Sequence, residues 1–226
     1  MKTFIFDLYN TLAEIHTDEH DVKSWTPIVR YFAERGADAD EKTLVELYDK
    51  GWDRHLSELA RSSEYEYPEG DICEVYRYMA ESVGIKLTAA ELRECAVIAR
   101  RASLRTFRLF DGIKELFAEL RGYGAKLYLL SNAQSVFTVD ELKEIGLYGE
   151  FDGMLLSSDH GCRKPDRAYF GILFDKYKLD KSDAVMVGDD PENDGKGARD
   201  FGIAFVLADG GAAAHRNELI ALAERA

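Results

Sequence analysis

Apolar, strand-like runs alternate with amphipathic, helix-like runs through the second half of the chain, and this alternation limits the possible folds more than any other feature. The strand-like runs there are AKLYLLSN (125–132), GMLLSSD (153–159), AVMVGDD (184–190) and IAFVLAD (203–209), and KTFIFD (2–7) near the start has the same texture. Strands that alternate with helices form parallel sheets, and continuous apolar runs are typical of strands buried on both faces. The sequence therefore predicts an α/β fold with a Rossmann-like parallel sheet and helices on both of its faces.

A long segment of helical texture separates the first strand-like run from the others. From about Glu14 to Phe107 it contains four stretches with helix start and stop signals and no convincing strand. In the first of them, we expect Thr26 to be the N-cap before Pro27, and Gly36 to end the helix. The sequence thus predicts two domains. Residues 1–13 and 108–226 would form the α/β core, and residues 14–107 would form an inserted helical-bundle cap.

Composition and charge argue against two classes of partner. No apolar run approaches the roughly 20 residues that a membrane-spanning helix needs. A net charge of −13 argues against a nucleic-acid partner, so we expect a small anionic substrate and no nucleic acid or membrane. The three cysteines form no CxxC pair and predict reduced thiols in a cytoplasmic protein. The composition leaves the oligomeric state open.

One basic cluster stands out in this acidic chain. It consists of Arg100, Arg101, Arg105 and Arg108 in the stretch ARRASLRTFR. We interpret it as a helix face, which is either simply solvated or forms an electropositive wall for a small anionic substrate.

Polar residues follow four of the strand-like runs. Ligands of open parallel sheets bind beyond the carboxyl ends of the strands, so we expect these residues to face one point. Carboxylates suit Mg²⁺, while a hydroxyl and an ammonium group suit phosphoryl oxygens. A carboxylate beside such a cation can attack a phosphoryl group. The pattern predicts a phosphoryl-transfer site built from Asp7, Ser131, Asn132, Lys164, Asp189 and Asp194.

Four motifs, in order, resemble those of the haloacid dehalogenase-like (HAD) hydrolase superfamily. They are FDLYNTL (6–12), LLSN (129–132), RKPD (163–166) and VGDDPENDGKGA (187–198). The helical insert lies where the type-one cap of subfamily I lies. The resemblance implies that Asp7 is the nucleophile and that Ser131 and Lys164 are catalytic residues that contact the phosphoryl group. It also implies a Mg²⁺ site and two residues on the substrate side. The implied metal ligands are Asp7, the backbone carbonyl of Tyr9, Asp189 and Asp194, and the substrate-side residues are Thr11, which would steady the motif-one turn, and Asn132.

Two residues of the first motif depart from the family pattern. Asn10 replaces the usual Gly, and since Asn tolerates a positive φ, we expect that backbone conformation there. Tyr9 replaces the second Asp, which in family phosphatases protonates the leaving oxygen. Tyrosine at this position is instead the pattern of 2-haloacid dehalogenases, although the fourth motif is phosphatase-like. Tyr9 therefore occupies an expected catalytic position, where it could act as at most a weak substitute acid, because a phenol has an ordinary pKa near 10.

Three functions remain open on these residues. The carboxylate set favours a Mg²⁺-dependent phosphohydrolase that forms an aspartyl-phosphate and prefers substrates with good leaving groups. Tyr9 favours a metal-independent 2-haloacid dehalogenase that forms an aspartyl ester. A catalytically weak domain that binds a metabolite or a partner is the third possibility.

Overall fold

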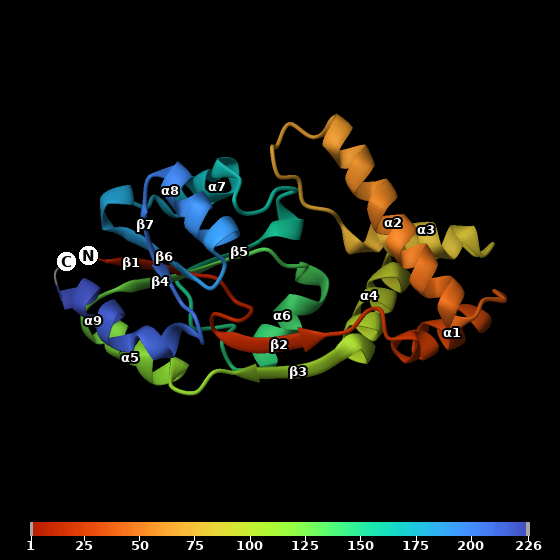
Figure 1. Cartoon of the computed structure of the whole chain (residues 1–226), viewed down its shortest axis with the longest axis horizontal. Coiled ribbons are helices and arrows are strands. Elements are labelled where there is room, and N and C mark those ends of the chain that lie inside the picture. The colour runs from red at the N-terminus through yellow and green to blue at the C-terminus, as the bar shows by residue number, and fades with distance from the viewer. Residues whose placement is uncertain (1, 225–226) are drawn as a thin grey trace. The chain divides into compact units, whose positions relative to one another are not determined.

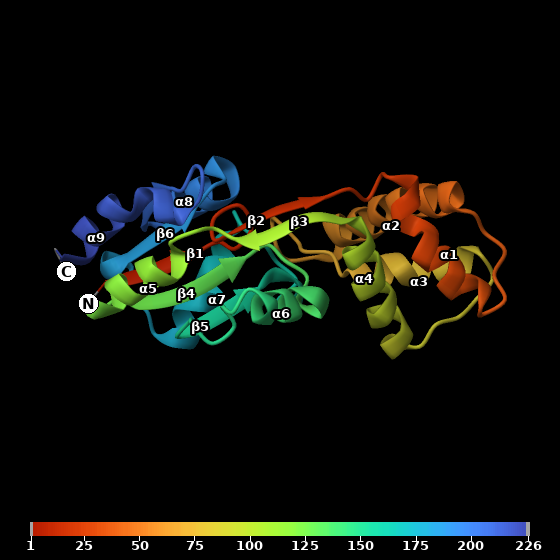
Figure 2. The ribbon, with the colours of Figure 1, turned by 90° about the horizontal axis from the view of Figure 1, so that it is seen from below.

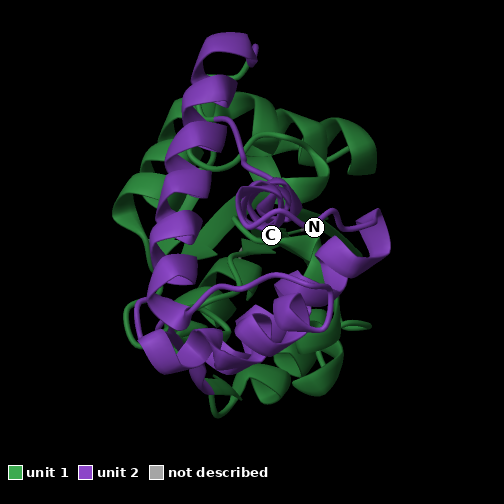
Figure 3. Cartoon of the chain, turned by 90° about the vertical axis from the view of Figure 1, so that its right-hand side faces the viewer, with its two compact units in different colours: residues 1–15, 65–67, 107–226 green, residues 16–64, 68–106 purple. Residues whose placement is uncertain are grey.

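The computed structural model describes residues 2–224 and divides into two compact units (Figure 3). Unit 1 consists of Met1–Ile15, Tyr65–Tyr67 and Phe107–Ala226, and unit 2 of His16–Glu64 and Pro68–Thr106. The ranges predicted for two domains have nearly the same ends. They do not anticipate that residues 65–67, from the middle of the helical segment, lie in unit 1.

A five-stranded parallel sheet forms the centre of unit 1, which confirms the predicted α/β class (Figure 1). Its central strand, β1, pairs with β4 on one side and with β6 on the other, so that Phe6 lies opposite Leu129 and Val187. The strands lie in the order β5-β4-β1-β6-β7. Their bounds are β1 (Thr3–Phe6), β4 (Lys126–Ser131), β5 (Gly153–Leu156), β6 (Ala184–Gly188) and β7 (Ala204–Leu207).

Helices cover both faces of this sheet (Figure 2). Phe4 and Phe6 point into one apolar core, which also contains residues of α5 (Ile113–Gly122), α6 (Ser135–Glu144) and α9 (Arg216–Glu224). Ile5 points into the opposite core, with α7 (Arg167–Tyr177) and α8 (Gly197–Phe201). Burial on both sides is the reason that the strand-like runs lack polar alternation. The short turns η2 (Ser157–Asp159), η3 (Lys181–Asp183) and η5 (Ala212–His215) also belong to unit 1.

Unit 2 contains each of the four predicted helices. They are α1 (Thr26–Ala33), α2 (Glu41–Ser62), α3 (Ile72–Ser82) and α4 (Ala89–Ser103), and the turn η1 (Val22–Trp25) precedes them. One predicted boundary is wrong by a residue: Trp25 is the N-cap of α1, and Thr26 is already helical. The Thr26 hydroxyl donates a hydrogen bond to Glu41 instead of capping its own helix.

Two further strands lie where the sequence predicted only helix. Strands β2 (Ala13–Thr17) and β3 (Leu104–Leu109) form a separate two-stranded sheet. Arg105 and Arg108 therefore lie on a strand, and the interpretation of the arginine cluster as one helix face is wrong. Arg105 bonds Asp21 and Arg108 pairs with Glu14. Strand β3 could not be predicted from the sequence, because no glycine or proline separates it from α4 and its partner strand is remote in sequence.

Among residues 2–224, none of the helices combines the length and hydrophobicity that crossing a lipid bilayer requires.

Candidate active site

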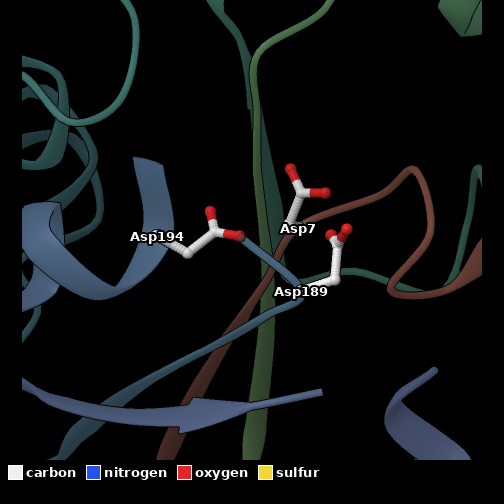
Figure 4. Close-up of side chains that lie close together, drawn as sticks. All are labelled: Asp7, Asp189 and Asp194. Atoms are coloured by element: carbon white, nitrogen blue, oxygen red, sulfur yellow. The ribbon is translucent and has the colours of Figure 1, made fainter. Parts of the chain in front are cut away.

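Three loops of unit 1 meet at the carboxyl ends of β1, β4 and β6. From β1 the sheet extends to β4 on one side and β6 on the other, so this edge is a topological switch point, where ligands of open α/β sheets bind. Asp7 directly follows β1, and its backbone N–H donates to the Val187 carbonyl at 2.9 Å. Asp189 directly follows β6. Carboxylate oxygens of Asp7, Asp189 and Asp194 lie within 4.8 Å of one another (Figure 4).

A buried lysine lies among these carboxylates. The Lys164 Nζ atom is 2.5 Å from Asp7 Oδ1 and 2.6 Å from Asp194 Oδ1, and the residue is 1% exposed. The Ser131 hydroxyl, at the end of β4, donates to the same Asp7 oxygen at 3.2 Å. Four residues that are far apart in the sequence are thus joined by direct hydrogen bonds around Asp7.

The electrostatic balance of this cluster is negative. Burial raises the pKa of Asp7, although the nearby Lys164 charge opposes the shift. Burial also raises the pKa of Asp194, to about 6, and that of Asp189. For Lys164, burial disfavours the charge, but Asp194 and Asp7 outweigh it and raise its pKa. One ammonium group faces three carboxylates, and an oxygen-rich site with excess negative charge fits a divalent cation.

Asn132 holds the loop that carries Lys164. Its side-chain oxygen accepts a hydrogen bond from the Lys164 backbone N–H at 2.8 Å, and its amide nitrogen donates to the Lys164 carbonyl at 3.0 Å. The peptide bond between Lys164 and Pro165 is cis. Because these two bonds engage both ends of the Asn132 amide, the structure gives this residue a positioning contact. Its predicted contact with substrate stays a prediction.

Thr11 links the first motif to the fourth. It is fully buried, and its hydroxyl donates to Asp189 Oδ1 at 3.0 Å and accepts from the Asp189 backbone N–H at 3.0 Å. Asn10, one residue earlier, has a φ of 59°, which confirms the expected left-handed conformation. Thr11 therefore orients Asp189, whereas its predicted place in the substrate site stays a prediction.

Asp194 reaches the site from a wide helical turn. One of the helix-like runs between the strands, ENDGKGARDFG (192–202), lies in a π-helical turn, η4 (Pro191–Lys196), followed by α8. Asp190 caps η4 by accepting from the backbone N–H groups of Glu192 and Asn193. A Cβ atom on Gly188 would lie 2.1 Å from Asp194 Oδ2, so only glycine permits this approach. The sequence analysis missed this role of Gly188, for which the glycine before Asp189 was the available signal.

Tyr9 points its hydroxyl toward α6. The phenol donates to Glu141 Oε2 at 2.5 Å and lies 2.9 Å from Thr138 Oγ1. Neither partner could be predicted from the sequence, because polar residues on a helix that covers a sheet ordinarily face solvent. Only the structure shows that Glu141 is buried beside Leu142. The predicted metal contact of the Tyr9 carbonyl stays a prediction.

A cavity of about 190 Å³ opens over these groups. It lies within unit 1. Residues from the first, second, third and fourth motifs all contribute to it, but the predicted site residues Ser131 and Thr11 are not among those that line it. Its lining is Asp7, Tyr9, Asn10, Asn132, Lys164, Asp189, Asp190, Asn193 and Asp194.

Comparison with known proteins agrees with this arrangement. Residues 1–202 match the family model of the haloacid dehalogenase-like hydrolases. The chain is 32% identical over 133 residues to a phosphoserine phosphatase from Thermus thermophilus; this match covers 59% of the chain and 52% of that relative, so the chain spans about half the length of that relative. It is 27% identical over 210 residues to a ribulose-1,5-bisphosphate 5-phosphatase from Halopiger xanaduensis, covering 91% and 83%.

The fold resembles that of a 2-haloacid dehalogenase from Pseudomonas syringae pv. Tomato DC3000, with a TM-score of 0.59. The two sequences are 21% identical, and the match covers 92% of this chain and 86% of that one.

Proposed function

Because this chain belongs to the haloacid dehalogenase-like hydrolase family, we propose that it is a Mg²⁺-dependent phosphohydrolase that acts through an aspartyl-phosphate on Asp7. The observation that carries the proposal is the group of Asp7, Asp189 and Asp194 oxygens within 4.8 Å, with the Lys164 ammonium bonded to two of them. The two phosphatases described above support phosphoryl transfer. We infer a small, phosphorylated and anionic substrate. The predicted cytoplasmic location stays a prediction.

In the proposed reaction, Asp7 forms a bond to phosphorus as the bond between phosphorus and the leaving oxygen breaks. The leaving group departs with the electron pair of that bond. Lys164 offsets the charge of Asp7 and of the transferring group, and Ser131 donates a hydrogen bond at the same place. Water then attacks the phosphorus, which frees Asp7 and phosphate. Bound Mg²⁺, held by Asp7, Asp189, Asp194 and the Tyr9 carbonyl, would neutralise negative charge between carboxylate and phosphoryl oxygens.

The substrate class follows from Tyr9. The Tyr9 phenol donates its single proton to Glu141, so its predicted role as a weak substitute acid requires that this bond breaks first. Loss of a general acid costs roughly a hundredfold to ten-thousandfold in rate, and least where the leaving group is stable as an anion. We therefore propose a preference for anhydrides, acyl phosphates or activated aryl esters over alkyl phosphates.

Tyr9 also favours a second candidate, a metal-independent 2-haloacid dehalogenase. In that reaction Asp7 attacks carbon to form an ester, and the departing halide needs no proton. The three clustered carboxylates argue against it, because they would repel the carboxylate of a 2-haloacid.

A substrate panel assayed for phosphate and halide, with Mg²⁺ and with a chelator, tests the proposal. We expect aryl and acyl phosphates to be hydrolysed only with Mg²⁺, alkyl phosphates to react at least roughly a hundredfold more slowly, and Asp7→Asn to be inactive. Halide release in the presence of chelator would establish the dehalogenase instead. Ligand binding without turnover, retained by Asp7→Asn, would identify a binding domain.

A further inference from the structure

Tyr9 is bonded to a buried polar pair on α6. Thr138 is fully buried and Glu141 is 7% exposed, although both are polar residues of α6. The phenol has one proton, which it donates to Glu141, so the hydrogen of the 2.9 Å bond to Thr138 comes from the threonine hydroxyl. The phenol oxygen is thus both donor and acceptor, and its direction is fixed.

The hydrogen bonds of Thr138 and Glu141 to Tyr9 offset the cost of burying these two polar side chains. A buried carboxyl group is costly unless hydrogen-bonded, and removing one partner leaves the other unsatisfied. Tyr9 lies two residues after Asp7 and lines the same cavity, whereas Thr138 and Glu141 are 129 and 132 residues away from Tyr9 in the chain. The contact therefore attaches the loop after β1 to α6, one of the helices that cover the sheet.

The loop after β1 is a tight turn with two side-chain anchors. The Asn10 N–H donates to the Ala13 carbonyl at 2.6 Å, and the Leu12 N–H donates to the Leu8 carbonyl at 2.8 Å. Thr11 anchors one side of the turn to Asp189, and Tyr9 anchors the other side to α6. Asn10, in its left-handed conformation, lies between the two anchors.

We propose that Thr138 and Glu141 are positioning residues of the active site, which fix Tyr9 and thereby hold the motif-one turn beside Asp7. They contact neither Asp7 nor Lys164 through any bond described above, and they act through Tyr9. The catalytic consequence rests on the proposed function, because a displaced turn would misplace Asp7 and the Tyr9 carbonyl. The effect on the turn itself is independent of any activity.

Hydrogen exchange of residues 8–13, measured on the metal-free protein, tests the structural part. We expect Tyr9→Phe and Glu141→Gln each to speed amide exchange in this turn about three- to tenfold, since the first removes both hydrogen bonds of the anchor and the second weakens the bond to Glu141. Combined, the two substitutions should give no more than Tyr9→Phe alone, because the proposed effect of Glu141 on the turn passes through the phenol. Glu144→Gln, an exposed change on the same helix, is the control and should leave the turn unchanged.

Thr138 offers a second pair of variants in case Glu141→Gln does not fold. Thr138→Val keeps the shape but lacks the hydroxyl, and Thr138→Ser keeps the hydroxyl. We expect faster exchange in the turn for valine and near-normal exchange for serine. Unchanged exchange in both Thr138→Val and Tyr9→Phe, or effects of Tyr9→Phe and Glu141→Gln that multiply, would overturn the inference.

Calorimetric titration with Mg²⁺ then separates this inference from the proposed function. We expect the dissociation constant for Mg²⁺ to rise about three- to tenfold in Glu141→Gln and Tyr9→Phe, with the double variant no weaker than Tyr9→Phe. If the wild type binds Mg²⁺ but hydrolyses no phosphate, the proposed function fails while the exchange result stands. If variants with faster exchange in the turn bind Mg²⁺ as tightly as the wild type, Thr138 and Glu141 do not position the active site.

Discussion

Lys164 is the residue on which the charge balance of the site depends. Its ammonium group is bonded to Asp7 and Asp194, and the lysine and both carboxylates are buried. Removing one member of a buried ion pair leaves an uncompensated charge, which is more costly than the pair itself is favourable. The lysine is therefore expected to stabilise the fold as well as the proposed reaction.

Replacing Lys164 with methionine should destabilise the metal-free protein by about 3–5 kcal/mol, because two buried carboxylates then face each other without a cation. Urea denaturation at neutral pH measures the change. Lys143→Met, on the exposed surface of α6, is the matched control and should change stability far less, because water screens an exposed ion pair. A Lys164→Met protein as stable as the wild type would show that the lysine charge is dispensable for folding.

Gly188→Ala tests the close approach of Asp194 to the end of β6. The new methyl group would lie 2.1 Å from Asp194 Oδ2, so the carboxylate must leave its present position. We expect a loss of about 1–3 kcal/mol of stability, as for other overpacked interiors, together with weaker Mg²⁺ binding. Gly122→Ala, at the end of α5 with no atom within 4 Å of the new Cβ, is the control. Equal Mg²⁺ affinity in the two variants would contradict the steric argument.

The sequence predicts which residue types meet at this site, but not how they are supported. Ser131 ends a strand of one parallel sheet, and Asp7 and Lys164 follow strands of the same sheet, so topology brings them to one edge. The bond from Tyr9 to Glu141 and the space that Gly188 leaves for Asp194 depend on distances between elements. A single sequence contains no measure of those distances.

At the scale of the elements, helix α4 has a capping box at its N-terminus. Thr88 and Glu91 form a reciprocal capping box at its start, and Arg35 of unit 2 also bonds Glu91. Hydrogen bonds from the backbone and side chain of Thr88, and then the bond from Arg35, lower the pKa of Glu91 to about 2. A folded-state pKa below the ordinary value of 4.5 means that the ionised carboxylate stabilises the helix.

Glu91→Gln should therefore lower the urea midpoint at neutral pH. Since the pKa is depressed on folding, the contribution of the carboxylate is fully present above about 4.5 and is lost as the pH falls toward about 2. The difference in urea midpoint between the variant and the wild type should shrink as the pH falls through that range. A difference that stays constant from pH 7 to pH 3 would mean that ionisation of Glu91 does not matter.

Element by element, the sequence predicts what is local and misses what is not. All five strands of the large sheet are apolar runs with flanking turn signals, and all five are present. Strands β2 and β3 were missed because both are partly exposed and each pairs with the other, which is remote in sequence. The π-helical turn η4 was read as ordinary helix, since its width follows from the position of Asp194 rather than from propensity.

Across the whole molecule, the proposed metal ligands and both tryptophans fall in different units. Asp7, Asp189 and Asp194 belong to unit 1, whereas Trp25 and Trp52 belong to unit 2. Tryptophan fluorescence therefore reports on unit 2, and metal binding acts on unit 1.

Magnesium at about one hundred times its dissociation constant should stabilise unit 1 by about 2.7 kcal/mol through mass action. We expect hydrogen exchange in the β-sheet to slow while the fluorescence-detected unfolding of unit 2 moves less. Asp189→Asn should abolish the effect. Equal stabilisation by both measurements would mean that the two units unfold as one.

The spacing of Asp7 and Lys164 along the chain has a consequence for biosynthesis. They are 157 positions apart, and Asp194 comes 30 positions after the lysine. On the ribosome, Asp7, the proposed nucleophile, emerges long before Lys164, which offsets its charge, and contacts between such distant positions form slowly. A nascent polypeptide that stalls before Asp194 is translated would contain Asp7 but an incomplete site, so we expect it to be inactive.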